Sequence, residues 1–191
     1  MDILSYLHST RSQRIRYTPT PNVPSCLHRR TAEIAGNAHF HTFSDSSWGT
    51  TRPSFGYVCF YSGGPVSYCA KNAKSAHSSC EAEYSAAAAA CRDVIFIRSV
   101  CDDLGWPLHG RLVLAVDNTA AINVATNLGV TSRNKHFDRE THFIREQVEL
   151  RRIVLQHIST VKQVADVFTK DLDKTTFLRH EQQLMSNVQN Y

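Results

Sequence analysis

The chain has 191 residues, 42% hydrophobic and 20% charged, with a formal net charge of +4. That is enough for one globular domain with a core plus extensions, and the mild basicity suits a polyanionic partner. No apolar run approaches the roughly 20 residues of a membrane span, the N-terminus lacks a signal-peptide layout, and the six cysteines form no CxxC pair. We therefore expect an intracellular protein without a membrane segment, a disulfide framework or a zinc site.

The first part of the chain predicts an appendage followed by antiparallel strands. Residues 2–11 favour a short helix, and the prolines within 18–24 break regular structure, so 1–35 is expected to be an appendage and linker. Apolar, β-prone runs follow, and the second of them ends in a Gly-Gly turn that predicts a hairpin. The strands are expected at 39–45, 55–64 and 65–70.

The second part of the chain predicts strands separated by helices. A long helix is expected at about 79–104, ended by Gly105 and Pro107. The continuous apolar run 111–116 is typical of a strand buried on both faces. Further elements are expected as helices at 117–127 and 132–152, a strand at 153–158, a helix at 159–172 with a Thr160…Gln163 capping box, and a helical tail from 174. The order predicts an α/β protein in which helices pack on the faces of a mixed sheet.

Two glutamates open the long helix, and their spacing gives them different environments. Glu81 completes a capping-box pattern with Ser78. Glu83 is the first member of an apolar stripe that continues at helical spacing through Ala87 to Val94, so it points toward the sheet. An acid there is costly unless it is paired, protonated or bound to a metal. An edge glutamate that reaches solvent is an equally open alternative.

Three aspartates stand at the ends of other core elements. Asp117 follows the buried strand at its carboxyl end, where ligand sites form in α/β sheets, although a helix N-cap explains a lone Asp as well. Asp45 ends a strand, and its alternative is an ordinary turn residue. Asp166 is expected one turn into a helix beside Lys162 and Lys170, where a solvated, charge-paired acid is the simplest interpretation.

Five motifs stand in order along the chain: "SDSSWG", "SSCEAEY", "VDNTAAI", "RNKHFDRETHFIREQV" and "QVADVFTKDL". Together they resemble the ribonuclease H domain at the C-terminal end of the Pol polyprotein of copia-type LTR retrotransposons. The resemblance runs from about 45 to 172. It implies a ribonuclease H-like, five-stranded mixed sheet, three antiparallel strands then two parallel, with helices on both faces. The implied domain is 36–173, with a C-terminal helical tail at 174–191 and the end of the reverse transcriptase in 1–35.

The resemblance also implies an activity and a site. It assigns a catalytic and metal-binding carboxylate set to Asp45, Glu83, Asp117 and Asp166, which would hold two Mg²⁺ (or Mn²⁺) ions. The implied enzyme hydrolyses the RNA strand of RNA/DNA hybrids and leaves a 5′-phosphate and a 3′-hydroxyl. The expected partners are the hybrid and the reverse transcriptase of the same polyprotein, in a cytoplasmic virus-like particle or the nucleus.

Several further residues are candidate nucleic-acid contacts because they are basic, begin a helix or adjoin a predicted acid. They are Lys71, Lys74, Ser79, Asn118, Arg133 and Lys135. For the last two, a solvated and salt-bridged helix is the alternative. Two other functions stay open: a non-catalytic nucleic-acid-binding remnant, and a nuclease acting on duplex DNA.

Overall fold

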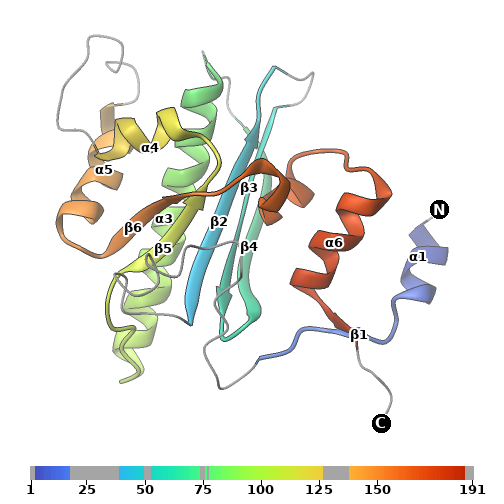
Figure 1. Ribbon diagram of the computed structural model, residues 1–191. Coiled ribbons are helices and arrows are strands. Elements are labelled where there is room, and N and C mark those ends of the chain that lie inside the picture. Colours follow the sequence, from blue (N-terminus) through green and yellow to red (C-terminus); the bar gives the residue numbers. More distant parts are fainter. Residues whose placement is uncertain are drawn as a thin grey trace.

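A five-stranded mixed sheet forms the centre of the protein, with the strand order β4-β3-β2-β5-β6 (Figure 1). The computed structural model describes residues 3–17, 39–49, 53–73, 76, 78–126 and 138–187. The strands are β2 (Phe40–Ser47), β3 (Ser54–Tyr61), β4 (Gly64–Asn72), β5 (Leu112–Val116) and β6 (Ile153–His157). The first three pair antiparallel, and β5 and β6 extend the sheet in parallel, which confirms the expected architecture.

Local sequence explains the hairpin and the central strand. Ser62 and Gly63 connect β3 to β4 with φ angles of 49° and 83°, the left-handed backbone that a two-residue hairpin turn requires. The predicted Gly-Gly turn is therefore shifted by one residue, because Gly64 already belongs to β4. Every residue of β5 is buried, as its unbroken apolar run predicted.

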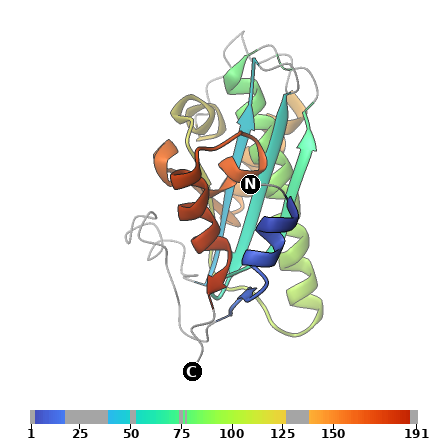
Figure 2. The same ribbon diagram turned by 90° about the vertical axis from the view of Figure 1, so that its right-hand side faces the viewer.

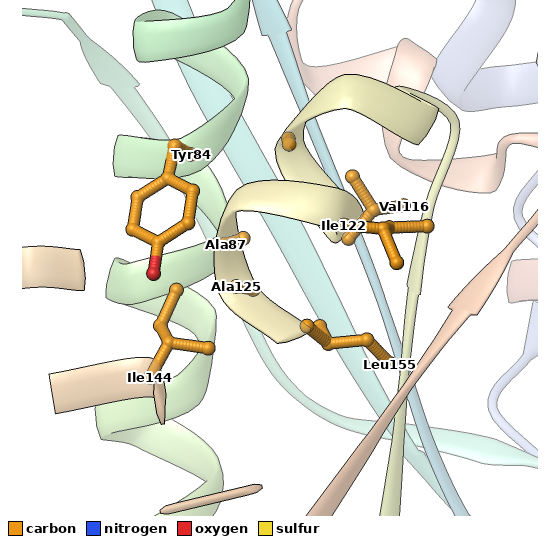
Figure 3. A pocket seen from close by; sticks show the side chains of 8 residues that line it. Tyr84, Ala87, Val116, Ile122, Ala125, Ile144 and Leu155 are labelled. Atoms are coloured by element: carbon orange, nitrogen blue, oxygen red, sulfur yellow. The ribbon is translucent and has the colours of Figure 1, made fainter. Parts of the chain in front are cut away.

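Three helices cover one face of the sheet: α3 (Ser79–Asp103), α4 (Thr119–Thr126) and α5 (Asp138–Glu149) (Figure 1). Small side chains such as Ala87 on α3 and Ala125 on α4 let these helices approach one another closely (Figure 3). Larger side chains fill the remaining space so completely that no water molecule fits. They are Tyr84, Val116, Ile122, Ile144 and Leu155. This packing fixes the start of α3, and with it Glu83, at the edge of the sheet.

The other face carries shorter elements, and here one prediction was wrong. The segment 159–172 forms two 3₁₀ helices, η2 (Thr160–Lys162) and η3 (Val164–Phe168), in place of one α-helix with a Thr160…Gln163 capping box. The Gln163 side chain accepts from the N–H of Ala165 and donates to the carbonyl of Ser44 at 2.9 Å. The two residues of the expected box therefore make other contacts, because the Thr160 hydroxyl reaches Asp117.

Both ends of the described chain meet on this second face (Figure 2). The predicted helices are present as α1 (Ile3–Ser9) and α6 (Lys174–Leu184), and β1 (Gln13–Arg14) pairs with β7 (Ser186–Asn187). Tyr6 lies edge-on to Phe177, and its hydroxyl donates to the buried carboxylate of Glu181. Residues 18–35 of the predicted linker lie outside the described residues, and the domain boundaries stay a prediction. Within the described ranges, no helix is long and apolar enough to cross a membrane.

Candidate active site

Three carboxyl groups converge at one edge of the sheet. An oxygen from each of Asp45, Glu83 and Asp117 lies within 4.8 Å of an oxygen of the other two. Each comes from a different element: β2, the second turn of α3, and the residue after β5. These residues are far apart in the chain, so the fold brings the three acids together.

The register of the sheet explains why the two aspartates are neighbours. Strands β2 and β5 run parallel, and their last pair is Ser44 with Val116. Asp45 and Asp117 are the next residues on their strands, so they leave the ladder side by side. Asp45 continues into the antiparallel ladder with β3 opposite Gly56, so it is a strand residue and the turn interpretation was wrong.

Helix α3 supplies the third acid in the manner that its sequence predicted. The Ser78 hydroxyl accepts from the N–H of Glu81 at 3.1 Å, which confirms that half of the capping box. Glu83 lies on the side that packs on the sheet, in line with the buried Ala87 and Val94. It is 7% exposed, so the alternative of an edge glutamate in solvent was wrong.

Glu83 has an incomplete set of partners for a buried acid. Its Oε1 accepts from the backbone N–H of Ser46 at 3.2 Å and from the Ser46 hydroxyl at 3.0 Å. Its Oε2 is buried without a hydrogen-bond partner among the described residues. Burial, reinforced by the charges of Asp45 and Asp117, raises the pKa of Glu83 to about 8. The carboxyl group therefore holds a proton at neutral pH until a positive charge replaces it.

The two aspartates differ in their contacts. Asp45 is fully buried, and burial raises its pKa while Thr169 and Lys170 act in the opposite direction. Burial and the charge of Asp45 also raise the pKa of Asp117, which accepts from the Thr160 hydroxyl at 3.2 Å. Asp117 is not the helix cap considered from the sequence, because the side chain of Asn118 accepts from the first N–H groups of α4.

The fourth predicted acid joins the cluster through a lysine. Asp166 lies in η3 and is 5% exposed, so the expected exposure to solvent was wrong, while the expected local charge pair with Lys170 is present. Lys170 places its Nζ 3.0 Å from Asp166 Oδ1 and 3.0 Å from Asp45 Oδ1. The Thr169 hydroxyl donates to the other oxygen of Asp45. The sequence placed Lys170 only near Asp166, because nothing in local spacing indicates its second contact with β2.

Two kinds of comparison place the chain among known proteins. It is 34% identical over 142 residues to the retrovirus-related Pol polyprotein from transposon RE1 of Arabidopsis thaliana, a match that covers 72% of the chain and 10% of the relative. The corresponding polyprotein from transposon TNT 1-94 of Nicotiana tabacum is 34% identical over 128 residues, 66% of the chain and 10% of the relative. The chain is therefore homologous to one segment of the retrovirus-related Pol polyproteins of transposons. It spans about a tenth of the length of these relatives. No protein-family model matches it.

Solved structures identify the fold of this Pol polyprotein segment. LC11-RNase H1, isolated from compost, superposes with a TM-score of 0.52 at 14% identity, over 68% of this chain and 91% of that chain. The segment therefore has the ribonuclease H-like fold that its sequence implied. The converging carboxyl groups stand at the carboxyl end of β5, the edge at which α/β sheets hold their ligands.

The predicted nucleic-acid contacts of the Pol polyprotein segment are only partly described. Lys71 is exposed on β4, and Ser79 is exposed as the first residue of α3. Asn118 caps α4 with its side-chain oxygen. Their binding roles stay predictions. Lys74, Arg133 and Lys135 lie outside the described residues.

The donor set fits a hard divalent cation. Mg²⁺ and Mn²⁺ prefer carboxylate oxygens, and Asp45, Glu83 and Asp117 offer one each within reach of a common centre. The buried Glu83 Oε2 accepts no hydrogen bond from the part of the chain that the structure describes. A bound cation would supply the positive charge that three crowded carboxyl groups need in order to ionise together.

Proposed function

We propose that this segment is a metal-dependent ribonuclease that hydrolyses the RNA strand of RNA/DNA hybrids, leaving a 5′-phosphate and a 3′-hydroxyl. The observation that carries the proposal is the convergence of Asp45, Glu83 and Asp117 within 4.8 Å at the edge of a ribonuclease H-like sheet. Homology to retrovirus-related Pol polyproteins of transposons supports the proposed setting, which is retrotransposon replication.

The catalytic work is assigned to the carboxylate set, with Asp166 as its fourth member. Two Mg²⁺ or Mn²⁺ ions would supply Lewis acidity at the phosphodiester and increase the nucleophilicity of water. Asp45 and Asp117 would hold the cations from the sheet, and Glu83 would hold them from the helix. Glu83 would do so as a carboxylate, because a nearby positive charge opposes the effect of burial on its pKa. Ser46 keeps the Glu83 carboxylate oriented through two hydrogen bonds.

We assign substrate contacts to two of the described candidate residues. Lys71 is exposed on β4 and would contact a phosphate, and Ser79 offers its N–H group at the start of α3. RNA would be distinguished from DNA through its 2′-hydroxyl groups. The proposed partner within the polyprotein is the reverse transcriptase, which would deliver the hybrid, and the proposed location is a cytoplasmic virus-like particle or the nucleus.

A cleavage assay on matched substrates tests this function. The RNA strand of a hybrid is labelled at its 5′ end and incubated with the protein in MgCl₂ or MnCl₂, beside double-stranded RNA and DNA. Cleavage of the hybrid alone, lost in Asp45→Asn and Glu83→Gln but kept in Glu81→Gln, is the expected result. Binding of the hybrid without turnover would identify a non-catalytic remnant, and cleavage of duplex DNA would identify a different nuclease. Undiminished cleavage by Asp45→Asn would remove the assigned site.

A further inference from the structure

Lys170 lies between Asp166 and Asp45, at the position where the proposed function would have these two carboxylates share a metal ion. Its ammonium group is 3.0 Å from one oxygen of Asp45 and 3.0 Å from one oxygen of Asp166. Asp45 is fully buried and Asp166 is 5% exposed, so the ammonium bridges two carboxylates that have little access to water. The ammonium group therefore fills the space between these two oxygens, so a metal ion cannot bind both of them while Lys170 stays in place.

The local backbone holds Lys170 in this position. The N–H groups of Thr169 and Lys170 both donate to the carbonyl of Asp166, at 3.1 and 3.0 Å, so the chain folds back at the end of η3. Gly56 on β3 permits the close approach, because a Cβ at that position would lie 2.5 Å from the Cβ of Phe168. The turn thus presses the segment after η3 against the sheet beside Asp45.

Electrostatics favours the bridge. Burial opposes the charge on the ammonium, but Asp45 and Asp166 outweigh burial and raise the pKa of Lys170 above its ordinary value. Lys170 is thus a resident monovalent cation that acts on Asp45, Asp117 and Asp166. Its side chain remains 34% exposed, so it has a path toward solvent.

We propose that Lys170 occupies one of the two cation positions of the site, so that divalent ions bind in two unequal steps. The first ion binds to Asp45, Glu83 and Asp117 with Lys170 in place. The second ion binds between Asp45 and Asp166 only after the ammonium withdraws toward solvent. This inference rests on the proposed function, because it concerns the same carboxylate set. Lys170 acts as a positioning residue, since its effect on the reaction passes through the second cation.

The size of the effect follows from the population of the withdrawn state. An apparent dissociation constant rises by the inverse of the fraction of molecules competent to bind. If Lys170 is withdrawn in about a tenth of the molecules or fewer, the second ion binds about tenfold or more weakly than it would to an open site. Removing the ammonium should restore that factor.

Counting bound Mn²⁺ tests the proposal without reference to cleavage. Mn²⁺ binding to the protein is measured by electron paramagnetic resonance and calorimetry in wild type, Lys170→Met and Lys162→Met. Lys162 is the matched control, because it is an exposed lysine at the end of η2 and its removal changes the net charge equally. The expected result is two unequal sites in wild type, with the second site tightened at least about tenfold in Lys170→Met and unchanged in Lys162→Met.

Several results would overturn the proposal. Two equal sites in wild type would do so, as would an unchanged second site in a folded Lys170→Met protein. If Lys170→Met does not melt cooperatively, Lys170→Arg tests the proposal instead. Its guanidinium group keeps the bridge between Asp45 and Asp166, so the second Mn²⁺ site should stay weak. A second site as tight as the first in Lys170→Arg would refute the inference. Unequal binding without hybrid cleavage would refute the proposed function and leave this inference standing. Cleavage with two equal sites would do the reverse, and an absence of bound Mn²⁺ would refute both.

Discussion

Exchange of Glu83 for glutamine should make the metal-free protein more stable at high pH while abolishing cleavage. Glu83 is a buried acid whose pKa rises from 4.5 to about 8 on folding. The folded protein therefore favours the neutral form of Glu83. The contribution of neutral Glu83 to the unfolding free energy is fully present below pH 4.5 and is lost as the pH rises through about 8. Glutamine is permanently neutral and keeps an oxygen to accept from Ser46, so the E83Q variant avoids the loss.

The magnitude follows from the pKa change. A tenfold change in proton affinity is worth about 1.4 kcal/mol, so ionising Glu83 in the fold costs roughly 4–5 kcal/mol of unfolding free energy above pH 8. The amide that replaces the unpaired Oε2 needs a partner of its own, and a missing one costs about 1–3 kcal/mol. The net advantage of E83Q at pH 9 should be about 1–4 kcal/mol.

Urea unfolding in EDTA, at pH 5 and pH 9, measures this difference, and Glu81→Gln is the matched control. Glu81 lies two residues away, in the first turn of the same helix and only partly buried. Its exchange should change stability by less than about 1 kcal/mol at either pH. Comparing variants at one pH cancels the titration of groups that do not interact with Glu83. A difference between E83Q and wild type that is the same at pH 5 and pH 9 would refute the assignment of Glu83 as a destabilised buried acid.

Three further outcomes follow from other contacts. The affinity for Mn²⁺ should fall by nearly tenfold for each pH unit below about 8, because the ion must displace the proton of Glu83. Calorimetry in buffers of different ionisation enthalpy should detect the released proton. An affinity that does not depend on pH would contradict this prediction. Gly56→Ala should lower the unfolding free energy by about 1–3 kcal/mol and slow cleavage, because the new methyl group clashes with Phe168 and displaces η3. An unchanged midpoint of urea unfolding would show that η3 does not pack so closely against β3. Tyr6→Phe should lower the unfolding free energy by about 1–2 kcal/mol, because the buried carboxylate of Glu181 loses the hydrogen bond from the Tyr6 hydroxyl. Hydrogen exchange of the α6 amides as slow as in wild type would show that the N-terminal segment does not stabilise that helix.

The hydrophobic pattern of a single segment was sufficient to predict which of its residues are buried in two elements, β5 and α3. The unbroken apolar run of β5 predicted a strand buried on both faces, and the stripe from Glu83 to Val94 predicted which side of α3 packs on the sheet. Both patterns are consequences of burial, so they are visible in one segment without knowledge of its neighbours. The placement of Glu83 toward the sheet was therefore available from its own helix, before any resemblance to a family was considered.

The segment after β6 could not be predicted in the same way, because its residues are used by distant partners. Thr160 and Gln163 have the spacing of a capping box, but Thr160 donates to Asp117 and Gln163 donates to the carbonyl of Ser44. Neither partner is close in sequence, so local spacing favoured an α-helix where the fold forms two 3₁₀ turns. The same tertiary contacts hold η3 against β2, which places Asp166 near the other acids and brings Lys170 to Asp45. The element that local rules predicted worst is thus the one that links the fourth acid to Asp45 through Lys170.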